Sequence, residues 1–142
     1  MRRRSMKWWV IAVCVSLAAG CSVVRKVTYP PDFVYLNRSD VTGYMKRMSG
    51  DIWRIDDVLS SSETILPYQR EKIITELEDM QTVADKLGAG TVNTNHPFID
   101  QNIDAFKRDV RLALQDVKGE PPAYYRAGRL SGRCLACHRL RK

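Results

Sequence analysis

The residues best suited to chemistry lie near the C-terminal end of the chain, in the stretch SGRCLACHRLRK. Two residues separate Cys134 from Cys137, and His138 follows the second cysteine directly. On a helix, side chains three residues apart lie about one turn apart on the same face. Two sulfur atoms can therefore bond to one partner while the imidazole of His138 approaches that partner from the same side.

Three kinds of site use cysteine and histidine at such spacing. A zinc site requires four nitrogen or sulfur ligands, and the only other histidine is the distant His96. A thioredoxin-like dithiol belongs to a βαβ unit, which this sequence does not indicate. Cys-x-x-Cys-His is the attachment signature of c-type haem. The motif therefore predicts one covalent haem c, bonded to Cys134 and Cys137, with His138 as the proximal iron ligand.

The opposite end of the chain indicates export. Four basic residues precede an apolar run: Arg2, Arg3, Arg4 and Lys7. The run is shorter than the ~20 residues of a transmembrane helix and is typical of a secretory signal. The stretch LAAGC that ends it resembles the bacterial lipobox, in which cleavage precedes a cysteine that becomes acylated. The resemblance predicts a cleaved lipoprotein signal peptide over residues 1–20 and lipidation of Cys21; an ordinary secretory signal is the alternative.

Lipidation would place the chain on the periplasmic side of a bacterial membrane, because several acyl chains anchor a protein stably in lipid. Ser22, in place of Asp after the cysteine, favours the outer membrane of a Gram-negative cell. Cys14 leaves with the signal and Cys21 carries lipid, so Cys134 and Cys137 are the only thiols that remain. No pair is left for a structural disulfide, which supports a cofactor as their partner.

The charge balance argues against a nucleic-acid partner. The chain has 23 basic and 16 acidic residues, and removal of the four basic residues of the signal leaves a net charge of about +3. Cations crowd the last predicted helix: Arg126, Arg129, Arg133, Arg139, Arg141 and Lys142. They have two interpretations, the steering of an acidic redox partner, or compensation of the helix dipole together with pairing to haem propionates.

Apolar residues recur at alternating spacings of three and four in four segments, and no segment shows strand alternation. The pattern predicts four amphipathic helices, roughly over residues 39–61, 67–87, 96–118 and 122–141. The short connections favour antiparallel neighbours. We therefore expect an all-α fold, an antiparallel up-down-up-down four-helix bundle over residues 39–142. Residues 21–38, with Pro30 and Pro31, form a lipidated tether ahead of it.

The last of these segments has an unusually thin apolar face. Ala127, Gly128, Ser131 and Gly132 occupy positions where a bundle normally carries Leu or Ile. Such a face leaves a void between helices, and voids are costly. A covalently held porphyrin would fill the space.

With four helices and a haem motif in the last one, residues 39–142 resemble the class II cytochromes c, the cytochrome c′ family. The family places the distal side of the iron in its first helix. Matching WRIDDVL to the end of that helix puts Met45 at the distal position, as the sixth ligand, with Met48 one turn later as the alternative. His96 is a third candidate, for which a helix-capping or surface role is the competing interpretation. In the five-coordinate cytochromes c′ a hydrocarbon side chain occupies the distal position.

The resemblance implies two functions. The first is a membrane-anchored periplasmic cytochrome that carries single electrons through a His/Met-ligated haem iron. The alternative is a five-coordinate, cytochrome c′-like protein that binds or senses NO or CO. An enzyme is not expected, because no acid or base stands beside the motif.

The chain departs from the family at the haem propionates. Val41 occupies the place of the usual arginine, which leaves Arg38, Arg129 and Arg133 as expected propionate partners. Family members often form homodimers through their first two helices, where Trp53 and Tyr68 would serve here.

Overall fold

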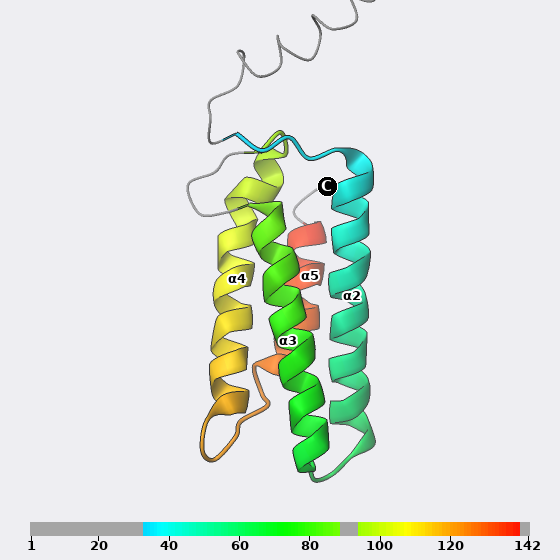
Figure 1. The fold of residues 1–142 in the computed structure, drawn as a ribbon, viewed down its shortest axis with the longest axis vertical. Helices are drawn as coiled ribbons and strands as arrows, with labels where there is room; N and C mark the ends of the chain where they lie inside the picture. Colours follow the sequence, from blue (N-terminus) through cyan, green and yellow to red (C-terminus); the bar gives the residue numbers. More distant parts are fainter. Residues whose placement is uncertain (1–32, 89–93, 140–142) are drawn as a thin grey trace, which may run out of the picture. The chain divides into compact units, whose positions relative to one another are not determined.

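The computed structural model describes residues 33–88 and 94–139. This part of the chain is helical: α2 (Arg38–Ser61), α3 (Pro67–Leu87), α4 (Pro97–Lys118), the 3-10 turn η1 (Ala127–Arg129) and α5 (Leu130–Arg139). Figure 1 shows α2, α3 and α4 side by side, with α5 behind them. The all-helical class is confirmed for the described residues. None of their helices has the length and apolar composition needed to cross a membrane.

The first three helices begin and end within one residue of the predicted positions, for identifiable reasons. The Asn37 side chain accepts a hydrogen bond from the Asp40 backbone N–H at 2.8 Å. Asp40 in turn accepts one from the Asn37 N–H at 3.3 Å, which completes a capping box at the start of α2. Helices α3 and α4 begin at Pro67 and Pro97. Proline is favoured at the first helical position, because a backbone N–H there would have no acceptor within the helix.

The fourth helix is shorter than predicted. The sequence pattern predicted a helix over residues 122–141, but α5 begins only at Leu130, after η1. The Ala123 N–H donates to the Asp116 carbonyl at 2.9 Å, so the segment after α4 folds back onto the end of that helix. Residues 140–142 lie outside the described part of the chain.

Ion pairs between neighbouring helices occur in reversed order along the two partners. Between α2 and α3 they are Arg47–Asp79 and Arg54–Glu76. Between α3 and α4 they are Asp85–Lys107 and Glu78–Lys118. In both interfaces the partner number falls as the residue number rises. These neighbouring helices therefore run in opposite directions.

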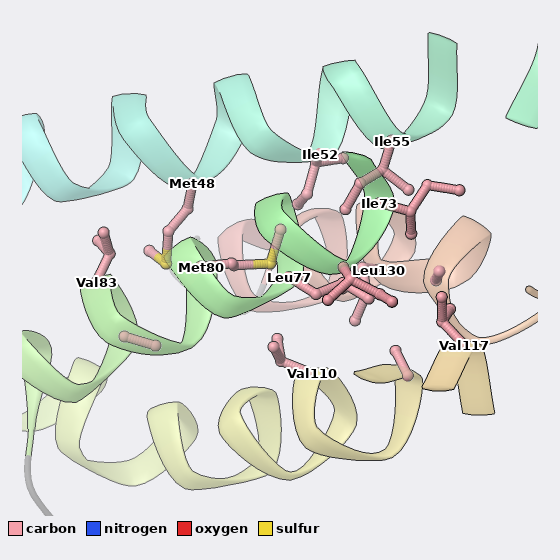
Figure 2. Close-up of a cluster of buried hydrophobic side chains, with 14 of the residues drawn as sticks. Met48, Ile52, Ile55, Ile73, Leu77, Met80, Val83, Val110, Val117 and Leu130 are labelled. Atoms are coloured by element: carbon pink, nitrogen blue, oxygen red, sulfur yellow. The ribbon is translucent and has the colours of Figure 1, made fainter. Parts of the chain in front are cut away.

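Helix α3 contributes the most deeply buried face of the core. Its inward residues are at most 1% exposed: Ile73, Leu77, Met80, Val83, Ala84 and Leu87. Figure 2 shows this face meeting side chains from the other helices, among them Met48, Ile52, Ile55, Val110, Val117 and Leu130. The three-and-four spacing in the sequence identified most of these core positions, but not Val83 or Leu130. At about 25 cal/mol per Å² of apolar surface, this burial is the main stabilising term of the fold.

The segment before α2 is fastened to the loop before α4. Leu36 is 5% exposed, and its N–H donates to Asn95 Oδ1 at 2.7 Å. The Leu36 carbonyl accepts from Asn95 Nδ2 at 2.9 Å and lies 3.0 Å from His96 Nε2, which must carry the proton because the carbonyl can only accept. Val34 and Thr94 form an isolated parallel bridge beside these contacts. We call Leu36, Asn95 and His96 the Leu36 clamp.

The clamp yields a first prediction. Asn95→Ala removes both side-chain hydrogen bonds to the Leu36 backbone. The Leu36 N–H is left without its partner, whereas the carbonyl keeps its contact with His96 Nε2. The free energy of unfolding should fall by about 1–3 kcal/mol. Urea unfolding followed by circular dichroism measures the change. Gln101→Ala, at an exposed position of α4, is the matched control and should change stability by less than about 0.5 kcal/mol. Equal stability of the two variants would contradict the clamp.

Candidate functional site

The structure places Cys134, Cys137 and His138 on one helix, α5. Both cysteines are free and half-buried, and Cys134 packs against the hydrophobic core. His138 is exposed in the last turn of α5, and no hydrogen bond or ion pair is recorded for its ring within residues 33–88 and 94–139. The helix therefore holds two thiols about one turn apart and leaves an imidazole accessible beside them.

The electrostatics of the two thiols argue against a redox dithiol. Burial raises the pKa of the Cys134 thiol, and the neighbouring Cys137 raises it further. Burial also raises the pKa of Cys137. Reactive thiol–disulfide centres depend on a lowered cysteine pKa, because the thiolate is the attacking species. The raised pKa values disfavour the thiolate form that thiol–disulfide exchange requires.

Close packing around the last helix is concentrated before the motif. Ala127 and Leu130 are each 2% exposed, and a Cβ atom at Gly128 would lie 3.3 Å from Leu59 Cδ1 of α2. Beyond this point the surroundings open. A Cβ atom at Gly132 would meet no heavy atom within 4 Å, and Leu135 is 58% exposed.

The change from close to open packing along α5 bears on whether a large cofactor fits there. The main contacts of α5 are with η1 and α4, and α2 contacts η1 more closely than it contacts α5. Helix α5 is therefore anchored by its first turn, and its motif-bearing half is only loosely covered by α2. Of the four small residues singled out in this segment, Ala127 and Gly128 lie in the closely packed turn, whereas Ser131 and Gly132 lie beyond it. A bulky group held at Cys134 and Cys137 would therefore find room beside Gly132, where a Cβ atom would meet no neighbour.

The two methionines proposed as sixth ligands have different surroundings. Met48 is 5% exposed, and Figure 2 shows its side chain directed into the core toward Met80 and Val83 of α3. Met45 is only half-buried and packs against the edge of the core. Both lie on α2, across from α5. Met48 therefore has a packing role of its own, whereas Met45 remains at the periphery.

His96 lies at the N-cap of α4, within the Leu36 clamp. Its backbone N–H also donates to Thr94 Oγ1 at 3.0 Å. The ring nitrogen Nε2 of His96 is already engaged by the Leu36 carbonyl. His96 occupies the N-cap position without a side-chain capping hydrogen bond, and the contact of its ring with Leu36 disfavours the ligand interpretation.

Three of the cations near the motif already have partners in the bundle. Arg126 pairs with Asp116 at 3.5 Å, and Arg133 pairs with Asp109 at 2.5 Å. Arg129 donates to the Tyr125 hydroxyl at 2.6 Å and lies over its ring. No partner is recorded for Arg38 or Arg139 among the described residues, and Arg141 and Lys142 lie outside them. Arg38, exposed at the start of α2, is therefore the least engaged of the three expected propionate partners.

Cys14 and Cys21 lie outside the described residues. Within the described ranges, no cluster of three or more His, Cys, Asp or Glu side chains could hold a metal ion. Comparisons of the chain with protein-family models, with curated proteins and with solved structures gave no match.

Sequence reasoning missed one charged feature. Asp51 of α2 is completely buried, in contact with arginine and with carboxylates of α3. The sequence did contain a sign of this burial, because Asp51 lies beside the apolar positions Met48 and Ile52 and three residues before Arg54. Only the structure shows that the acidic side chain is enclosed.

A second prediction separates the two methionines. Met48→Ala should lower the free energy of unfolding by about 2–5 kcal/mol, because it removes a buried side chain from a packed core. Met45→Ala, the matched control on the same helix, should cost clearly less. Urea unfolding of the two variants measures this difference, and a larger loss for Met45→Ala would contradict the placement of Met48 in the core.

Proposed function

We propose that the protein is a lipid-anchored periplasmic c-type cytochrome that carries single electrons. The observation that carries the proposal is the last helix, where two free, half-buried thiols and an exposed imidazole share one short helix that is loosely covered beyond its first turn. No other described group of side chains combines these donors. When bound there, haem c would supply a one-electron iron couple.

We also propose the topology of the fold, an up-down-up-down four-helix bundle. The reversed order of the ion pairs between α2 and α3, and between α3 and α4, supports it. Arg126–Asp116 and Arg133–Asp109 show the same reversed order between α4 and the final segment. The motif would thus occupy the last helix of the bundle, next to the first.

Each residue of the site has a distinct part. Cys134 and Cys137 would hold the porphyrin through thioether bonds, which fixes its position without reliance on packing alone. His138 would bind the iron from the same helix. Met45 is the better-placed sixth ligand, because Met48 is committed to the core. A thioether opposite histidine raises the potential of haem iron toward that of electron carriers.

The surroundings of the site suggest how a partner would meet it. Leu135 and His138 are exposed on α5, and Arg139 adjoins them without a recorded partner in the described part of the chain. This apolar and positive surface would suit an acidic redox protein. The acylated Cys21 would keep the bundle at the membrane. Trp53 and Tyr68, 68% and 69% exposed, remain the expected contacts of a homodimer.

One observation favours the alternative function, a five-coordinate haem that binds NO or CO. Val41 and Tyr44 lie with Met45 at the half-buried edge of the core. If the thioether of Met45 does not reach the iron, these side chains leave the distal position to hydrocarbon and aromatic groups. A small gas molecule could then bind there.

Covalent attachment is the third prediction. The protein, expressed in a host that matures c-type cytochromes, should keep its colour through denaturation and acidified-solvent extraction. Cys134→Ser combined with Cys137→Ser should release all pigment, because no thioether can form. Ser131→Ala, one turn before Cys134 on the same helix, leaves both thiols in place, serves as the control and should retain the colour. A colourless wild-type protein, or pigment that washes out, would overturn the proposal.

The sixth ligand gives the fourth prediction. Met45→Ala should convert a low-spin, six-coordinate ferrous spectrum to a high-spin one and lower the midpoint potential. Met48→Ala, where it folds, should leave the spin state unchanged. Visible absorption and a redox titration measure both effects. A wild-type protein that is already high-spin and binds carbon monoxide readily would instead support the gas-binding alternative.

A further inference from the structure

Asp51 is the most enclosed charged side chain in the described ranges. It lies at the interface of α2 and α3 and is 0% exposed. One carboxylate oxygen, Oδ1, accepts a hydrogen bond from Arg54 Nη2. The other, Oδ2, is buried and has no hydrogen-bond partner among the described residues. A buried carboxylate oxygen without a donor is costly in its ionised form.

Four further charged groups surround Asp51, two from each helix. On α2, Arg54 also pairs with Glu76 of α3 at 2.7 Å. Arg47 donates from Nε to Asp79 of α3 at 2.6 Å and from Nη2 to the other oxygen of the same carboxylate. We call Asp51, Glu76 and Asp79, with Arg47 and Arg54, the α2–α3 carboxylate cluster.

Gly50 of α2 lies next to the Arg54 side chain of this cluster. Gly50 lies in the middle of α2, where glycine costs about 0.5–1 kcal/mol relative to alanine. A Cβ atom there would lie 3.3 Å from Arg54 Nη1. The absence of a side chain at position 50 therefore leaves room for the Arg54 guanidinium to reach Asp51 and Glu76 together.

The charges of the cluster do not balance when every group is ionised. Within the cluster, three carboxylates face two guanidinium groups, which leaves one negative charge without a partner in direct contact. The Arg47 and Arg54 side chains are 56% and 40% exposed, and Lys86 of α3 also acts on Asp79. Glu76 and Asp79 are 13% and 27% exposed, whereas Asp51 has no exposed surface. Binding of one proton would neutralise the cluster, and the cost of burying charge is greatest at Asp51.

The carboxylates differ in their response to this environment. The bidentate bond from Arg47 lowers the pKa of Asp79. Burial first, and then the charge of Asp79, raise the pKa of Asp51 to about 6 against the opposing effect of Arg54. The proton therefore belongs on Asp51.

We propose that the α2–α3 carboxylate cluster is a proton-binding site, in which Asp51 takes up one proton on Oδ2 and donates it toward the carboxylate of Glu76. Arg54 continues to hold Oδ1 and Glu76 in both states. The site is independent of the haem motif and of the function proposed for it.

The proton should strengthen the contact between α2 and α3. A carboxyl group whose pKa is higher in the folded than in the unfolded protein binds protons more tightly when folded. The contribution of Asp51 to stability is therefore greatest at low pH and falls as the pH rises from about 4 through about 6. Above this range Asp51 is ionised, and α2, the helix that carries Met45 and Met48, is held less firmly.

The fifth prediction tests this site. Asp51→Asn keeps an acceptor for Arg54 but carries no titrating proton. Its free energy of unfolding, minus that of the wild type, should grow as the pH rises from 4 to 7 and then level off. Asp57→Asn, at an exposed position of the same helix, should show a difference that does not vary with pH. A flat difference for Asp51→Asn would overturn the proposal.

Infrared spectroscopy of the intact protein gives an answer that does not depend on stability. The wild type at pH 5 should show the carbonyl stretch of a buried, protonated carboxyl group, and that band should disappear by pH 8. The band should be present in Asp57→Asn and absent from Asp51→Asn. If Asp51→Asn does not fold, selective isotope labelling of aspartate in the wild type identifies the band. No aspartate band at pH 5 would overturn the proposal.

Discussion

Burial of one apolar face of α3 supports the whole arrangement of the described residues. Helix α2 packs against one side of it and α4 against the other, and each of its inward side chains from Ile73 to Leu87 is almost completely removed from water. Leu130 reaches the same core from the first turn of α5. The rest of α5 lies farther from this centre. The described bundle is thus built mainly around three helices, and α5 contributes less to the packing.

This division explains why the cysteines and the histidine can lie together on a poorly covered helix. A helix required for the core would need large apolar residues where α5 has Ser131 and Gly132. Because α2, α3 and α4 bury the core among themselves, α5 is free to carry small and polar residues around Cys134 and Cys137. The fold therefore tolerates small residues such as Ser131 and Gly132 in α5.

The sequence predicted α2, α3 and α4 closely, because apolar periodicity, Pro67, Pro97 and Gly119 are local signals that packing reinforces. The start of α5 was predicted too early, since Tyr124 and Ala127 continue the helical spacing although Pro121 and Pro122 precede them. The Leu36 clamp and the burial of Asp51 were not predicted. Both depend on contacts between residues far apart in the chain. Asn95 does not differ in its local pattern from a surface residue, and the place of Asp51 beside Met48 and Ile52 does not by itself show that the side chain is enclosed. The motif was found from spacing alone, whereas the different surroundings of Met45 and Met48 required the structure.

The Leu36 clamp also has a mechanical consequence. The backbone of Leu36 is bonded to Asn95 and His96, in a different part of the chain, before α2 begins. A pull on the chain ahead of Val34 is therefore transmitted first to the loop before α4, and it reaches the opening turn of α2 only after those bonds yield. The clamp therefore shields the first turn of α2 from tension applied to the preceding segment.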